Sequence, residues 1–225
     1  MPQTNRRTFL ETSVLTPMQV GRIHRAASLS DEKPAQLTAL ISVIACDAFE
    51  LASVLVSDVN RATGDFRIMA ADGSHKQVAL GFHGAIAIHN VIAGRRDGFL
   101  LSDPHGPNPL KPDLDTLDYA RQLVSDIDPA IDFLWSFRSI RECLVSTLMD
   151  GGLPYALVEA QMGLGSVYRD VEGVTGLIAQ RAAADWLAVQ LGLGVVSPFE
   201  LIDLAGIAAD AFEENQRLRG GRAFR

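Results

Sequence analysis

The chain of 225 residues has little cysteine, few aromatic residues and fewer positive than negative charges. Its two cysteines, Cys46 and Cys143, lie in apolar helical patterns without metal-ligand spacing, so we expect small buried side chains. No apolar run reaches the roughly 18 residues that cross a bilayer. The N-terminus has arginines but no signal-peptide stretch behind them. These absences predict a cytoplasmic protein with no membrane partner.

The charge balance argues against one class of function. With 20 Lys and Arg against 27 Asp and Glu, the formal charge is −7, which is unsuited to coating nucleic acid with the whole surface. The charge is uneven, however. Residues 97–132 are strongly acidic, whereas the final eleven residues, NQRLRGGRAFR, hold four arginines and no acid. A local basic face therefore remains open.

What the chain does have is apolar surface for a core. Hydrophobic residues make up 48% of it, which suits one domain of ordinary size. The patterns predict a mainly α fold with a small antiparallel β hairpin. Residues 1–14 form a polar arm, residues 15–173 the principal domain, and residues 174–225 a C-terminal helical extension with a basic tail.

Several element boundaries carry sequence signals. Thr16, Pro17 and Gln19 form a capping box that starts a helix. A longer helix, apolar on nearly every face, is expected over Pro34–Leu55. Asp72-Gly73 between two short runs predicts a hairpin. A helix ending at Gly94, a proline-rich loop over 102–113, and helices at about 113–126, 138–150 and 154–163 follow.

Two further helices are expected near the C-terminus. The first, GLIAQRAAADWLAVQLG, has an apolar stripe of Leu177, Ile178, Ala182, Trp186 and Val189, and we expect it to close the core. The second starts at Ser197-Pro198 with a capping box. Whether it packs on its own domain or on a partner is left open.

Three segments resemble the catalytic domain of the tyrosine recombinases, the family of phage integrases and Xer-type recombinases. LTPMQVGRIHRAA is similar to the family's entry helix. IACDAFELASVLVSDVN matches, without a gap, a family segment in which Glu50, Leu51, Val54, Ser57, Asp58 and Val59 fall in register. RSIRECLVSTLMDGGLPYALVEAQMGLG matches the family segment that begins H-x-L-R. Their order, with a hairpin between the first blocks, implies the same fold.

The resemblance implies a reaction in which a tyrosine attacks a DNA phosphate, two arginines stabilise the charge, and a hairpin lysine and histidines move protons. This chain departs from that pattern. The position of the first arginine holds Asp47, and that of the lysine falls at or near Ala71, with Lys76 farther along the hairpin. Arg138 replaces a histidine, Arg141 is the retained second arginine, and Glu142 follows it. The positions of the last histidine and of the nucleophile hold Leu164 and Gly173, and Tyr168 lies shortly before Gly173. A carboxylate beside a phosphate repels it, so Asp47 argues against cleavage.

The remaining cations are candidates for contacting DNA. They are Arg141, Arg138, His75 and Lys76 on the hairpin, Arg61 and Arg67 around its first strand, and Arg95 and Arg96 after the following helix. Each has a structural alternative. Arg141 could form an ion pair with Glu142, Asp47 or Glu50, Arg138 could be an exposed helix-start residue, and the hairpin could be an ordinary polar turn. The last pair could serve the helix dipole alone.

No cofactor or metal is expected, because the five histidines show no ligand spacing and no phosphate-binding glycine loop is present. Trp135 and Trp186 are interpreted as core residues. The leading hypothesis is a non-catalytic integrase-like DNA-binding protein, a bacterial transcription regulator of phage-like or gene transfer agent genes. This chain resembles the integrase-like activators of gene transfer agent genes in being rich in alanine, stripped of catalytic residues and short of a clamp domain. It would bind double-stranded DNA together with a second protein. The alternatives are a protein-interaction module without DNA binding, or a divergent active recombinase using Tyr168.

Overall fold

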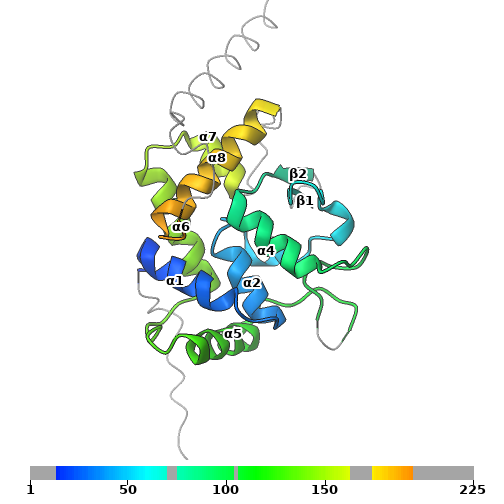
Figure 1. Cartoon of the computed structure of the whole chain (residues 1–225), viewed down its shortest axis with the longest axis vertical. Coiled ribbons are helices and arrows are strands. Elements are labelled where there is room, and N and C mark those ends of the chain that lie inside the picture. The colour runs from blue at the N-terminus through cyan, green and yellow to red at the C-terminus, as the bar shows by residue number, and fades with distance from the viewer. Residues whose placement is uncertain (1–13, 70–74, 104–105, 163–173, 195–225) are drawn as a thin grey trace, which may run out of the picture.

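The computed structural model describes residues 14–69, 75–103, 106–162 and 174–194 (Figure 1). Within these residues the fold is mainly α with one antiparallel hairpin, as predicted. Its elements are α1 (Pro17–Ala27), α2 (Lys33–Ile41), α3 (Ala48–Ala52), the short 3-10 helix η1 (Val56–Asp58), β1 (Phe66–Met69), β2 (His75–Val78), α4 (Phe82–Ile92), α5 (Leu114–Ile127), α6 (Phe137–Asp150), α7 (Tyr155–Gln161) and α8 (Val174–Gln190). The helix α2 is central, because α1, α3, α4, α5 and α6 all pack against it.

The start of α1 confirms the predicted capping box. The backbone N–H of Gln19 donates to the Thr16 hydroxyl over 3.3 Å, and the Thr16 N–H donates to the Gln19 side chain over 2.8 Å. These two bonds satisfy donors that the first turn of a helix leaves without a partner. The helix buries Val20, Ile23 and Ala26, and it packs on α2, α5, α6 and α8.

The single helix predicted over Pro34–Leu55 is wrong, because the chain forms two helices there. The first, α2, ends at Ile41, and α3 begins only at Ala48. The Asp47 carboxylate accepts from the Phe49 N–H over 2.8 Å and so caps the start of α3. Every residue from Ser42 to Cys46 is buried, so the apolar pattern continues through the break and hides it from sequence analysis.

The predicted hairpin is confirmed. Phe66 pairs with Val78, Arg67 with Gln77, Ile68 with Lys76, and Met69 with His75. Phe66 and Ile68 are buried while Arg67 between them is exposed, which is the two-residue alternation of a strand with one covered face. The turn that contains Asp72-Gly73 lies outside the described residues.

The helices α4, α5, α6 and α7 lie close to where the sequence places them. One difference is the end of α4, where Ala93 takes the left-handed conformation at φ 42° ahead of Gly94 at φ 84°. At the start of α6 the Ser136 hydroxyl accepts from the Ser139 N–H over 3.0 Å. Trp135 is 2% exposed, which confirms it as a core residue.

The helix α8 completes the core, as expected, but with a different face from the predicted stripe. Ile178 and Val189 are 43% and 40% exposed, whereas Ala179, Ala183, Leu187 and Leu191 are buried. The contact face is rich in alanine because the helix backbones approach closely. A Cβ added to Gly21 of α1 would lie 1.8 Å from the Leu191 carbonyl oxygen. The second predicted C-terminal helix, from Ser197, lies outside the described residues.

The acidic segment 97–132 includes α5, which Figure 1 draws at the lower end of the molecule, away from the hairpin. Part of its charge serves local structure. Asp113 caps α5 through the Thr116 N–H, Asp118 pairs with Arg121, and Asp128 pairs with Arg22 of α1. Among the described residues, no helix is long and apolar enough to cross a membrane.

Candidate functional site

Four charged residues, one of them Arg141, lie close together. Asp47 and Glu50 come from the start of α3, Lys76 from β2 and Arg141 from α6. They are close enough that the charges of the other three act on the pKa of the Glu50 carboxyl. The fold therefore brings together two of the predicted DNA-contacting residues, Arg141 and Lys76, but sets two carboxylates beside them. We call these four residues the mixed-charge cluster.

Glu50 is the least satisfied member of the mixed-charge cluster. Its Oε2 atom is buried and has no hydrogen-bond partner among the described residues. Burial raises the pKa of the Glu50 carboxyl, and the nearby Asp47 charge adds to that effect, while Lys76 and Arg141 lower it. The Glu50 carboxylate attracts the charges of both Lys76 and Arg141. Their charge is then partly neutralised before any phosphate arrives.

Arg141 is half-buried and turned toward the protein. Its Nε donates to the Ala45 carbonyl oxygen over 3.0 Å, at the junction that precedes α3. No ion pair within 4.0 Å joins it to Glu142, Asp47 or Glu50 in the described part of the chain, so that alternative is not realised. The remaining guanidinium nitrogens could still donate to an anion.

Arg138 lies one turn before Arg141 but points into solvent. Its Nε pairs with Glu142 Oε1 over 2.7 Å, and the two side chains are 87% and 58% exposed. This is an ordinary pair between residues four apart on a helix surface. Glu142 therefore pairs with Arg138 and not with Arg141, which precedes it.

The hairpin divides its predicted site residues between two faces. Lys76 is directly opposite the buried Ile68, so both side chains lie on the face toward the core. Arg67 is opposite Gln77 and exposed on the other face. His75 stands at the start of β2, opposite Met69. A single flat surface cannot contact both Lys76 and Arg67.

Arg61, Arg95 and Arg96 gather where α4 ends, apart from the mixed-charge cluster. Arg95 donates to the carbonyls of Val91 over 3.0 Å and Phe99 over 2.9 Å, and also to that of Leu100. It therefore closes the last turn of α4 onto the segment that follows, in line with the structural alternative. Arg61 donates to the Arg95 carbonyl, and Arg96 is exposed.

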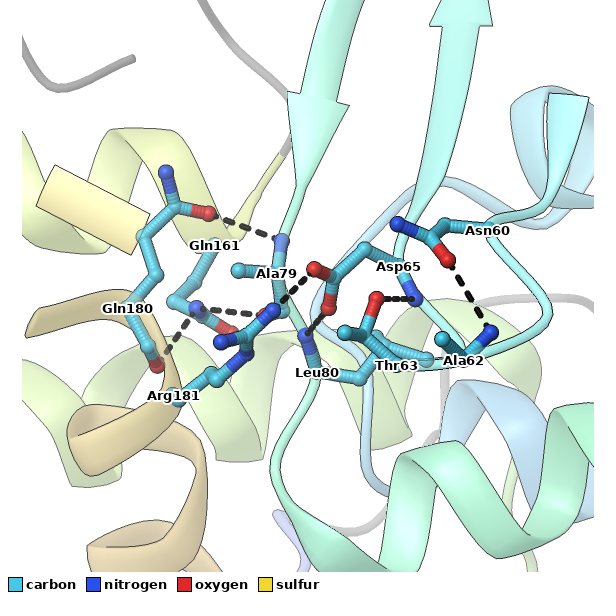
Figure 2. Close-up of polar contacts among 9 residues, drawn as sticks. All are labelled: Asn60, Ala62, Thr63, Asp65, Ala79, Leu80, Gln161, Gln180 and Arg181. Atoms are coloured by element: carbon cyan, nitrogen blue, oxygen red, sulfur yellow. Dashed lines mark hydrogen bonds and ion pairs between the residues drawn. The ribbon is translucent and has the colours of Figure 1, made fainter. Parts of the chain in front are cut away.

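Sequence analysis missed a polar network at the base of the hairpin (Figure 2). Asp65, 2% exposed, pairs with Arg181 of α8 and accepts from the Leu80 N–H over 3.1 Å. The side chains of Gln161 and Gln180, both nearly fully buried, bind the backbone of Ala79. The partners lie far apart in sequence and no local pattern connects them. The only signal is the presence of glutamines at positions that the helical pattern buries.

The cysteines behave as small core residues. The Cys46 Sγ donates to the Gln161 carbonyl over 3.6 Å, and burial raises the pKa of its thiol to about 12. Burial also raises the pKa of Cys143. No group of three His, Cys, Asp or Glu that could hold a metal occurs within the described ranges. Leu164, Tyr168 and Gly173, the positions near the expected nucleophile, lie outside those ranges.

Comparison with known proteins supports the fold. No family model matches the sequence, and no curated protein matches it. A crystal structure of XerA recombinase is similar, with a TM-score of 0.54 and 16% sequence identity over 83% of this chain. The chain spans 66% of the length of that structure. The chain thus has a tyrosine-recombinase-like fold.

Proposed function

We propose that the protein binds double-stranded DNA without cutting it and regulates the transcription of phage-like or gene transfer agent genes with a second protein. The observation that supports this most is the mixed-charge cluster. In this proposal Lys76 and Arg141 face the DNA phosphate, but Asp47 and the half-buried Glu50 carboxylate offset their charge. That composition can tolerate a DNA backbone passing nearby but is poorly suited to stabilising the added charge of a cleavage transition state.

The first test is binding of the full chain to a duplex at 50 and 200 mM salt, with genome-wide occupancy of the tagged protein. A regulator should give discrete peaks at promoters, and its affinity should fall steeply with salt because phosphate contacts release counterions. A nicked substrate should give no SDS-stable adduct. An adduct that disappears in Tyr168→Phe would instead identify an active recombinase.

The second candidate is a protein-interaction module that no longer contacts DNA. The observation in its favour is again electrostatic, because the net charge is −7 and Arg138 and Arg95 have their charges or donors engaged within the protein. Absence of occupancy peaks and salt-independent, weak binding would favour it. In that case the mixed-charge cluster has become a structural element of the core.

A further inference from the structure

The residues that flank the hairpin are held by two helices from a distant part of the chain. Asp65 immediately precedes β1, and one of its oxygens accepts from the Leu80 N–H, two residues after β2, over 3.1 Å. Its other oxygen pairs with Arg181 of α8. The Asp65 side chain is 2% exposed, so Arg181 is the charged partner of a carboxylate that water hardly reaches. One carboxylate thus joins both strand ends to α8.

Ala79, the residue directly after β2, is held through both of its backbone polar groups. Its N–H donates to Gln180 Oε1 over 3.0 Å, and its carbonyl accepts from Gln161 Nε2 over 3.4 Å. Gln161 of α7 also donates to the Gln180 carbonyl over 2.9 Å, so α7 and α8 act on Ala79 as one unit (Figure 2). These are buried hydrogen bonds, which are the least tolerant of displacement.

The hairpin needs such support because it is small. It has two strands of four residues, and a two-stranded hairpin alone is marginal in water. Lys76 lies three residues before Ala79, or roughly 10 Å away along the strand at about 3.3 Å per residue. A tilt of about 10° at the base would move Lys76 by roughly 2 Å, which is enough to break a hydrogen bond to a phosphate.

We propose that Asp65, Gln161, Gln180 and Arg181 are positioning residues, which fix the hairpin on α7 and α8 and so set where Lys76 meets DNA. We call these four residues the hairpin clamp. The proposal rests on DNA binding as the proposed function. The hairpin clamp itself contributes geometry rather than phosphate contacts, because the Arg181 charge is committed to Asp65.

The test is the double variant Asp65→Asn with Arg181→Met in the full chain. It removes the ion pair without leaving a buried charge, keeps the net charge, and leaves the asparagine oxygen able to accept from Leu80. We expect amides of the hairpin and residues 79–80 to exchange at least tenfold faster, with α6 unchanged. DNA affinity should fall about tenfold, and the slope of log affinity against log salt should stay as in the wild type, because no phosphate contact is lost.

Two comparisons sharpen the result. The control is Arg22→Met with Asp128→Asn, an Arg–Asp ion pair between α1 and the end of α5 with a more exposed carboxylate, which should leave hairpin exchange and DNA affinity unchanged. Lys76→Ala should instead lower the salt slope by about one, if Lys76 contacts a phosphate. The proposal is overturned if the Asp65/Arg181 variant exchanges its hairpin amides and binds DNA as the wild type does. It is also overturned if the salt slope of the variant falls by one, because Arg181 would then itself contact DNA. If the wild type does not bind DNA but the variant's hairpin exchanges faster, the proposed function fails and the hairpin clamp remains.

Discussion

Acid should destabilise this protein through one buried histidine. His24 of α1 is 6% exposed, and its Nδ1 lies 2.9 Å from the Ala39 carbonyl oxygen. Its ring meets that of His83 edge-to-face with centroids 6.0 Å apart, and the Ser28 hydroxyl lies 3.4 Å from its Nε2. Burial lowers the pKa of His24 from 6.5 to about 4, although the bond to Ala39 acts in the opposite direction. The charges of His83 and Arg25 lower it further.

The direction and size of the change in unfolding free energy with pH follow from these two pKa values of His24. As the pH falls, the unfolded chain takes up the proton at 6.5, whereas the folded chain does so only near 4. The stability is therefore fully present above about pH 7 and lost progressively between pH 6.5 and 4. The interval corresponds to about 3 kcal/mol of unfolding free energy, at roughly 1.4 kcal/mol per pH unit. Below about pH 4 this contribution stops changing.

Urea denaturation at intervals from pH 7.5 to 4.5, followed by circular dichroism, measures this effect. The wild type should lose most of the expected 3 kcal/mol over that range, while His24→Gln, already less stable at pH 7.5, should show a much flatter profile. His89→Gln, at an exposed position of α4, is the control and should behave as the wild type. The ion pair with Arg22 lowers the pKa of Asp128, so the stability that this pair contributes is lost only at lower pH. An equally steep profile in His24→Gln would refute the reasoning.

Three other outcomes are expected. Glu50→Gln should raise the free energy of unfolding at pH 7 by roughly 1 kcal/mol, because it removes charge from a buried oxygen without a partner, and urea denaturation measures this. The gain should vanish as the pH falls through the raised pKa of Glu50, and a loss at pH 7 would contradict the account of the mixed-charge cluster. Arg141→Ala should weaken DNA binding about tenfold and lower the slope of log affinity against log salt by about one, while the circular dichroism spectrum stays unchanged. Arg138→Ala should weaken DNA binding less. If both variants bind DNA as tightly as the wild type, the DNA binds elsewhere on the protein. Gly21→Ala should destabilise the fold by about 2 kcal/mol or more in thermal denaturation, because the added Cβ would lie 1.8 Å from the Leu191 carbonyl oxygen. Gly106→Ala, whose added Cβ meets open space, should leave the melting temperature unchanged.

Features encoded by neighbouring residues could be predicted from the sequence. Thr16 and Gln19 predict a helix start because the hydrogen bonds between them span only three residues. The hairpin is predicted by the two short runs on either side of the turn dipeptide Asp72-Gly73. The meeting of Arg141 and Lys76 beside Glu50 was not predicted, although both residues were named as candidates for contacting DNA. The sequence comparison placed the hairpin lysine near Ala71, which lies outside the described residues, whereas the register sets Lys76 on the inner face.

What could not be predicted depends on partners far along the chain. The break between α2 and α3 is invisible because Ser42–Cys46 stay buried while leaving the helix. The face of α8 was misjudged because large apolar side chains usually turn inward, whereas here small residues allow α8 to approach α1 closely. The pair of Asp65 with Arg181 has no sequence signal at all, since each residue alone reads as a surface charge.

The close contact of Gly21 with Leu191 also has a consequence for biosynthesis. Among the described helices, α1 is made first and α8 last, so the side of α1 that contacts α8 stays uncovered until α8 has been made. Contacts of such high sequence separation form slowly. During that interval the nascent chain offers an apolar surface to chaperones and proteases. The folding of α1 is therefore completed only when α8 is available.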